Sequence, residues 1–260
     1  MKVVLTIAGS DSSGGAGIQA DIKTFEAFGV FGTSVLTVLT AQNTKGVEGI
    51  FPVDPSFVKA QLNSVFDDFD VAAVKIGMLF SNEVIEAVRD FIKELKIPVV
   101  FDPVFISKAG SSLLSDDSVQ SLKELLQYCT VTTPNLYEAK KLFNYEPFSN
   151  SSLIYIQNSP CPVVVKNHQL MIENEKKSVD ILYMDDNKLL FDTPFLESNN
   201  THGTGCSYSS AISANLALGY TLKESITISK KFIYHAIKNA PQIGHGKGPV
   251  SHKEGVKACL

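Results

Sequence analysis

Short apolar runs rich in β-branched residues alternate with amphipathic segments through most of this sequence, and this alternation constrains the fold more than any other feature. We predict strands at residues 3–8, 33–40, 71–76, 98–101, 129–133 and 163–166. Between the first two runs, Ile18, Ile22, Phe25 and Phe28 recur at helical spacing, which places them on one helix face. Strands that are apolar throughout and separated by helices are typical of a mostly parallel sheet with helices on both faces. The sequence therefore predicts an α/β fold.

Two further patterns complete this prediction. Apolar residues at helical spacing predict helices over residues 84–95 and 119–126, and a polar cluster at 115–118 is suited to cap the second helix. Residues 180–184 and 188–191, joined by a polar turn, predict an antiparallel hairpin at one edge of the sheet. The C-terminal third is expected to be mostly helical. No repeat or linker divides the sequence, so we expect a single domain over residues 1–260.

The composition narrows the classes of function. A chain with 44% hydrophobic and 19% charged residues is ordinary for a globular protein, and its net charge of −4 argues against a general nucleic-acid binder. The four cysteines are far apart, which favours neither a disulfide framework nor a zinc motif. The N-terminal apolar run is too short for a signal peptide, and no later run is long enough to span a membrane. We expect a cytoplasmic protein that acts on a small molecule.

The stretch at residues 200–206, Asn-Thr-His-Gly-Thr-Gly-Cys, carries the strongest chemical signal. Glycines allow backbone N–H groups to turn inward, and the helix expected from Ser207 to Leu218 adds further N–H groups at its positive end. Gly203, Thr204 and Gly205 therefore predict a seat for a phosphate. The same field is expected to lower the pKa of Cys206 and favour its thiolate. The alternative is a glycine-rich turn before a core helix, with the cysteine simply buried.

Loops after the other predicted strands carry polar groups that suit a ligand. The first loop, residues 9–17, is rich in glycine, and we interpret it as a turn that admits a flat substrate rather than as a dinucleotide-binding fingerprint. Gln42 follows the second strand, and a carboxamide can donate and accept hydrogen bonds at once, which suits an aminopyrimidine edge. The C-terminal loop at residues 244–249 either closes over phosphate or is a plain loop.

Oxygen-bearing side chains follow the fourth and fifth strands. Asp102 comes directly after one, and Asn135 and Glu138 follow the other, three residues apart. Carboxylate and carboxamide oxygens suit Mg²⁺ beside a nucleotide phosphate. The spacing of Asn135 and Glu138 also fits a helix N-cap with its capping-box partner, and spacing alone favours that structural role.

In this order, these motifs resemble those of the bacterial hydroxymethylpyrimidine/phosphomethylpyrimidine kinases of thiamine synthesis, in the vitamin-kinase branch of the ribokinase-like superfamily. The resemblance extends from about residue 5 to residue 252. The segments that carry it are TIAGSDSSGGAGIQAD (6–21), AQNT (41–44), KIGML (75–79), DPV (102–104), TPNL (133–136) with Glu138, THGTGC (201–206) and GHGKGP (244–249).

The resemblance implies a three-layer α/β fold, often dimeric, that uses ATP and Mg²⁺. The implied activity is phosphorylation of 4-amino-5-hydroxymethyl-2-methylpyrimidine to its monophosphate and then to its diphosphate. It assigns pyrimidine binding to Gln42, Gly9, Asp21 and Met78. The phosphate and metal side is assigned to Asn135, Glu138, Lys166 and Asp102, with Asp102 and Glu138 at the metal. The backbone of residues 203–206 would stabilise the transferring phosphoryl group, with Cys206 as general base.

Two departures from the family pattern fall on the nucleotide side. Where the family usually has Lys-Gly-Gly-His, this chain has Lys166-Asn167-His168-Gln169, so the close approach of backbone to nucleotide is in question there. The segment at residues 144–162 is also short for the family's usual helix. Both changes leave the pyrimidine side intact, and we expect activity with weaker nucleotide binding.

Three other functions are open from the sequence. A pyridoxal kinase of the same branch would share the first loop and the cysteine. A non-catalytic pyrimidine-binding protein would explain the altered loop after Lys166. A hydrolase with Cys206 as nucleophile and His202 as its base would use the same backbone cradle as an oxyanion hole.

Overall fold

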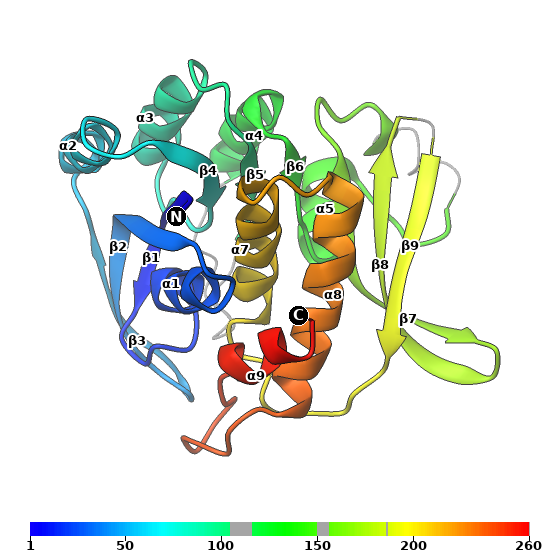
Figure 1. Cartoon of the computed structure of the whole chain (residues 1–260). Helices are drawn as coiled ribbons and strands as arrows, with labels where there is room; N and C mark the ends of the chain where they lie inside the picture. Colours follow the sequence, from blue (N-terminus) through cyan, green and yellow to red (C-terminus); the bar gives the residue numbers. More distant parts are fainter. Residues whose placement is uncertain (105–115, 150–155, 186, 260) are drawn as a thin grey trace.

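The computed structural model describes residues 1–104, 116–149, 156–185 and 187–259, and its centre is one nine-stranded sheet (Figure 1). The strand order is β3-β2-β1-β4-β5-β6-β7-β8-β9. The strands are β1 (Val3–Asp11), β2 (Phe31–Asn43), β3 (Gly46–Pro52), β4 (Val71–Ile76), β5 (Val99–Phe101), β6 (Val131–Thr132), β7 (Val163–Ile172), β8 (Glu175–Met184) and β9 (Asn187–Pro194).

The sheet is parallel in its middle and antiparallel at both edges. Strands β2, β1, β4, β5, β6 and β7 pair in parallel, whereas β3 pairs antiparallel with β2 and β8 pairs antiparallel with β7 and β9. The predicted hairpin is confirmed as β8–β9 at the outer edge. The prediction of a mostly parallel α/β sheet is therefore confirmed.

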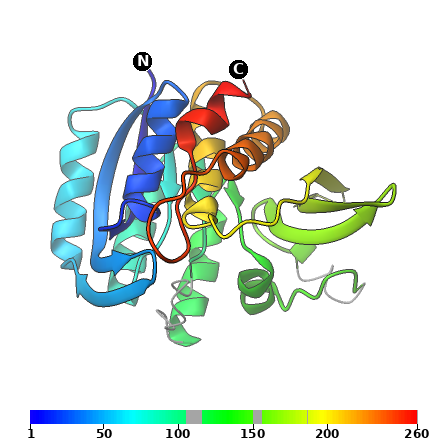
Figure 2. The same ribbon diagram turned by 90° about the horizontal axis from the view of Figure 1, so that it is seen from below.

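Helices cover both faces of the sheet and complete three layers (Figure 2). One face carries α1 (Gly17–Ala27), α7 (Thr204–Ala217), α8 (Leu222–Lys238) and α9 (His252–Lys257), which pack against one another. The other carries α2 (Pro55–Phe66), α3 (Asn82–Ile92), α4 (Asp116–Leu125) and α5 (Leu136–Phe143), with the short 3₁₀ turn Leu126–Tyr128 after α4. Among the described helices, none is both long and apolar enough to cross a membrane.

Amphipathic patterning places each helix. In α3, the buried residues Val84, Ile85, Val88 and Ile92 face the core that contains β4 and β5, and the Ser81 hydroxyl accepts a hydrogen bond from the Val84 N–H at 3.3 Å. The helix ends at Ile92, before the predicted end at residue 95. The cap predicted at residues 115–118 for α4 lies partly outside the described residues.

Two elements were not predicted, and several strands have other bounds. Strand β3 is largely exposed and α2 buries only Val58 and Leu62, so neither gives a strong apolar period. Strand β1 continues beyond residue 8 to Asp11, and β6 is reduced to two residues. The extension of β1 matters most for function, because it places the start of the predicted first loop within the sheet.

Candidate active site

A cavity of about 220 Å³ lies where the carboxyl ends of the central strands meet the N-terminus of α7. This is the edge at which ligands bind in open α/β sheets. The predicted site residues that line it are Gly9, Gln42, Met78, Asp102, Asn135, Glu138, Lys166, Gly203, Thr204, Gly205 and Cys206. Seven different segments of the chain therefore converge on one cavity.

The glycine-rich stretch forms a tight cradle at the cavity floor. Gly203 has φ +78°, and a Cβ there would lie 1.8 Å from the Gly15 carbonyl oxygen, so only glycine fits. Helix α7 begins at Thr204, three residues earlier than predicted, so the N–H groups of Gly205 and Cys206 belong to its first turn. Those groups have no carbonyl partner within the helix and are available to an anion.

Cys206 does not have the lowered pKa predicted from its place at the helix start. Burial raises the pKa of its thiol to about 11, against the opposing charge of Lys75, and the carboxylates of Asp21 and Asp102 raise it further. Desolvation and nearby negative charge thus outweigh the helix field. The thiol is protonated in the ligand-free protein at neutral pH.

A buried cation and a buried carboxylate lie beside the cradle. Lys166 Nζ is 2.6 Å from Asp102 Oδ1, which also accepts a hydrogen bond from the Thr133 hydroxyl at 3.2 Å. A Cβ on Gly205 would lie 3.3 Å from Lys166 Nζ and 3.5 Å from Asp102 Oδ2. The cradle and the charged side chains therefore face the same small space.

Asn135 and Glu138 form the capping box that their spacing favours. The Asn135 side chain accepts from the Glu138 N–H at 3.0 Å, and the Glu138 carboxylate accepts from the Asn135 N–H at 2.7 Å. Burial raises the pKa of Glu138 to about 8, with a further rise from Asp102, although Lys166 lowers it. Glu138 therefore caps α5 and also presents a readily protonated carboxyl group to the cavity.

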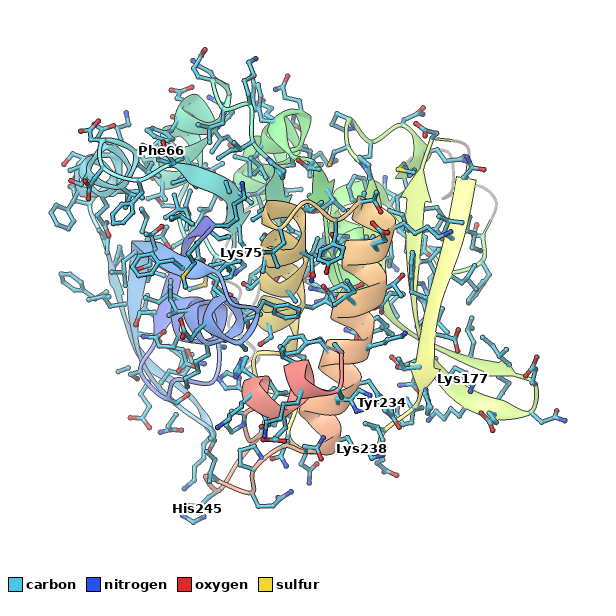
Figure 3. The ribbon with its side chains drawn as sticks, viewed as in Figure 1. Phe66, Lys75, Lys177, Tyr234, Lys238 and His245 are labelled. Carbon is cyan, nitrogen blue, oxygen red and sulfur yellow. The ribbon has the colours of Figure 1, made fainter. Side chains whose placement is uncertain are left out.

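Asp21 lies outside the cavity lining, contrary to its predicted place in the pyrimidine pocket. It is fully buried, 2.8 Å from Lys75 Nζ, and accepts hydrogen bonds from the hydroxyls of Thr6 and Ser210, each at 2.7 Å. Lys75 reaches the cavity instead, in the centre of the molecule beside α7 (Figure 3). The sequence signal for Lys75 was a charged residue inside an apolar strand, which requires a buried partner.

Apolar side chains line the cavity near Gln42, which pairs with Val47 between β2 and β3. Val47 and Ile50, from the unpredicted strand β3, line it together with Gln42 and Met78. A Cβ on Gly9 would lie 2.7 Å from Val38 Cγ1 and 2.8 Å from Met78 Cε, so glycine allows Met78 to pack here. One carboxamide within an apolar slot suits a small flat ring.

Sequence reasoning assigned no site role to Asp11 and left His202 only as a possible base for Cys206. Both residues line the cavity, with His202 Nε2 only 2.7 Å from Asp11 Oδ2. Burial would raise the pKa of Asp11, but hydrogen bonds from His202 and Ser13 hold it at about 2. The imidazole Nε2 is engaged by Asp11, and the thiol of Cys206 is protonated, so the arrangement gives no support to a cysteine hydrolase.

A second cavity, of about 310 Å³, lies between the β8–β9 edge and α8. It shares Lys166, Asn167, Thr204 and Gly205 with the first cavity. Asn167 has φ +72°, a left-handed conformation that asparagine tolerates better than most residues. The backbone therefore follows a path suited to glycine although both family glycines are replaced. The short segment at residues 144–162 lies partly outside the described residues.

The C-terminal loop packs beside the first cavity without lining it. The N–H groups of His245 and Gly246 donate to the Thr44 hydroxyl at 3.2 and 3.1 Å, and the Lys247 N–H donates to the Thr44 carbonyl at 2.9 Å. His245 marks this loop at the lower edge of the molecule in Figure 3. These contacts favour a loop that braces the β2–β3 turn over one that closes on phosphate.

Known proteins share this architecture and these motifs. A hydroxymethylpyrimidine/phosphomethylpyrimidine kinase of Haemophilus influenzae is 41% identical, with 97% of each chain covered. The ADP complex of Bacillus subtilis pyridoxal kinase superimposes with a TM-score of 0.87 at 37% identity, covering 98% of both chains. A phosphomethylpyrimidine kinase of Clostridium difficile gives a TM-score of 0.77 at 38% identity, over 91% of this chain and 100% of that one. The family model described as phosphomethylpyrimidine kinase matches residues 11–251, and the chain belongs to that family.

Proposed function

We propose that this protein is an ATP-dependent kinase that phosphorylates 4-amino-5-hydroxymethyl-2-methylpyrimidine and then its monophosphate. The observation that carries the proposal is the junction between the two cavities. Lys166, Thr204 and Gly205 line both, at the N-terminus of α7. A phosphoryl group that passes from a donor in one cavity to an acceptor in the other would cross this positive helix end.

The residues at the junction fit a polyphosphate and a divalent cation. Gly205 leaves the space that a Cβ would occupy beside Lys166 and Asp102. Two carboxyl groups, Asp102 and Glu138, face the cavity, and Mg²⁺ is commonly held by one or two carboxylates together with phosphate oxygens and water. Bound Mg²⁺ would offset negative charge on the phosphates.

Different groups of this chain would contribute to different parts of phosphoryl transfer. The first-turn N–H groups of α7 would hold the transferring phosphoryl oxygens, and Lys166 would balance their charge. In its thiolate form, after its own proton has passed to solvent, Cys206 would accept the proton of the substrate hydroxyl. The Lys75 ammonium would favour that form, since this cation lowers the pKa of the thiol. Because that pKa is high in the ligand-free protein, positioning and charge stabilisation would supply most of the rate.

Pyridoxal is the second candidate acceptor, favoured by the close structural similarity to a pyridoxal kinase. Both acceptors should be incubated with the protein, ATP and Mg²⁺, and the products resolved by mass spectrometry. We expect the pyrimidine monophosphate followed by the diphosphate. Pyridoxal phosphate alone would assign the function to the second candidate. Pyrimidine binding without either product would indicate a non-catalytic binding protein.

A homodimer and a cytoplasmic location are further parts of the proposal. The homodimer rests on the family resemblance, and the location is the expectation from the sequence. Light scattering after size-exclusion chromatography is expected to give twice the mass of the 28.2 kDa chain. A monomer would remove the homodimer from the proposal.

A further inference from the structure

Two side chains contact the Gln42 carboxamide at the apolar end of the first cavity. Gln42 Nε2 lies 3.4 Å from His202 Nε2, and Gln42 Oε1 lies 3.1 Å from Thr40 Oγ1. All three residues line the cavity. The oxygen and nitrogen of a carboxamide are assigned from their hydrogen-bond partners, so the protons of these two neighbours decide which way the amide faces.

Thr40 has a single hydroxyl hydrogen, and that hydrogen already has a partner. Thr40 Oγ1 donates to the Ser10 carbonyl oxygen at 2.7 Å, and a carbonyl oxygen can only accept. The hydroxyl is therefore left as an acceptor toward Gln42. Only the NH₂ of the Gln42 carboxamide can donate a hydrogen bond to this hydroxyl oxygen.

The imidazole of His202 places the opposite requirement on Gln42. Asp11 Oδ2, 2.7 Å from His202 Nε2, also accepts from the N–H groups of Gly15 and Ala16, and Asp11 Oδ1 accepts from Ser13. A carboxylate with these donors is ionised and can only accept, so His202 Nε2 carries a hydrogen. That hydrogen is donated to Asp11, so the Gln42 NH₂, 3.4 Å from the same nitrogen, would set a second donor against it, whereas the Gln42 carbonyl oxygen can lie there without such a conflict.

We propose that Thr40 and His202 are positioning residues that fix the Gln42 carboxamide with its oxygen toward His202 and its NH₂ toward Thr40. In this orientation the Thr40 oxygen receives a donor and no donor faces the His202 N–H, whereas the reverse sets two donors against each other. The second amide hydrogen and the remaining oxygen lone pair then face the cavity in one fixed order. They match a ring edge that has an acceptor nitrogen beside an exocyclic amino donor. An aminopyrimidine has such an edge and a pyridoxal ring does not.

This inference rests on the proposed function for its substrate, and its test separates the two. Binding of the hydroxymethylpyrimidine to Thr40→Val is measured by calorimetry without ATP, so the result does not depend on turnover. We expect Kd to rise about tenfold, the size of one lost hydrogen bond with an unpaired partner. Thr40→Ser restores the hydroxyl and is expected to restore Kd. Thr33→Val is the matched control, because it lies on the same strand and removes a hydroxyl bonded to the Val4 carbonyl away from the cavity.

Coupling to Gln42 distinguishes positioning from a general effect on the fold. In a Gln42→Ala background, Thr40→Val is expected to change Kd by less than about twofold, because the group it orients is gone. Gln42→Met serves as a second background with a side chain of similar length. His202→Phe should behave as Thr40→Val does, and both should lower the preference for the pyrimidine over pyridoxal in kcat/KM mainly through KM. An unchanged Kd in Thr40→Val, or the same loss with and without Gln42, would overturn the proposal. Failure to phosphorylate the pyrimidine with this coupling intact would overturn only the proposed function.

Discussion

Single residues in this cavity take their chemistry from neighbours that are distant in sequence. Cys206 lies in the first turn of α7, where the helix field favours an anion, yet its thiol pKa is raised to about 11. Asp21 and Asp102 contribute to that rise, and they come from the first helix and from the end of β5. Local spacing could predict that Cys206 stands at a phosphate seat. It could not predict the pKa, which depends on burial and on which charges the fold brings together.

Replacement of the cysteine tests its role as the proton acceptor. Cys206→Ala is expected to lower kcat at least roughly 100-fold, the usual contribution of a positioned base, with little change in pyrimidine Kd. Steady-state kinetics and calorimetry on the same preparation measure both quantities. Cys206→Ser controls for the lost volume while keeping a poorer base. Near-normal kcat in the alanine variant would assign catalysis to positioning and charge alone.

Asp11 gives a prediction on stability and pH. Its pKa is lowered from 3.8 to about 2, so its charged form stabilises the fold above the unfolded-state pKa, and this stabilisation is lost as the pH falls toward 2. Asp11→Asn is expected to lower the free energy of unfolding by roughly 1–2 kcal/mol at pH 7. Urea titrations at pH 7 and pH 3 should show a smaller difference from wild type at pH 3. An equal difference at both values would contradict the assigned hydrogen-bonded carboxylate.

At the scale of elements, helix α5 combines a structural cap with the site. The Asn135–Glu138 capping box fixes the start of the helix, and the same Glu138 side chain faces Lys166 and Asp102. The sequence indicated both roles, and the structure shows that a capping residue can also line the cavity. Glu138 can both cap α5 and line the cavity because α5 starts at the carboxyl end of β6, where ligands bind in such sheets.

Substitution of Glu138 by glutamine separates the cap from the charge. Glutamine can also serve in a capping box, so α5 should remain intact. The folded-state pKa of Glu138 is raised to about 8, so wild type loses stability as pH rises from about 4.5 to 8, because the folded form holds its proton longer. Glu138→Gln is expected to lose less stability over that range and to need more Mg²⁺ for activity. Parallel pH profiles of unfolding would contradict the raised pKa.

The elements that sequence reasoning missed are those with weak apolar patterns. The buried strands β1, β4 and β5 and the amphipathic helix α3 were predicted because burial on one or both faces gives a clear pattern. Strand β3 is an exposed edge and α2 buries few residues, so tertiary context places them. Because β3 was not predicted, two residues that line the cavity, Val47 and Ile50, were not predicted either.

At the scale of the molecule, two cavities meet at the start of one helix. Sequence motifs predicted most of the cavity lining because ligand-facing loops follow strand ends in order. The contacts between distant segments, such as Lys75 with Asp21 and His202 with Asp11, emerged only from the folded chain. The whole arrangement places Gly205 among the residues that line both cavities.

A side chain larger than hydrogen at residue 205 should lower activity while leaving the fold at least as stable. Gly205→Ala adds a methyl group 3.3 Å from Lys166 Nζ and is expected to lower kcat at least roughly tenfold by displacing the phosphoryl group. The helix itself should gain up to about 1 kcal/mol, because alanine is the better helix former. Gly49→Ala is a control in which the new Cβ meets only the Ala41 Cβ, at 3.5 Å. Normal turnover in Gly205→Ala would place phosphoryl transfer elsewhere.

The most direct test of the account is the course of the reaction with the hydroxymethylpyrimidine and excess ATP and Mg²⁺, followed by ³¹P NMR and mass spectrometry. We predict a monophosphate that appears first and then converts to a diphosphate, with two ATP molecules consumed for each pyrimidine. We predict that Cys206→Ala slows the first step more than the second, because only the first acceptor is a hydroxyl whose proton must be removed. ATP-dependent phosphorylation of pyridoxal with none of the pyrimidine, or no phosphorylation of either, would contradict this account.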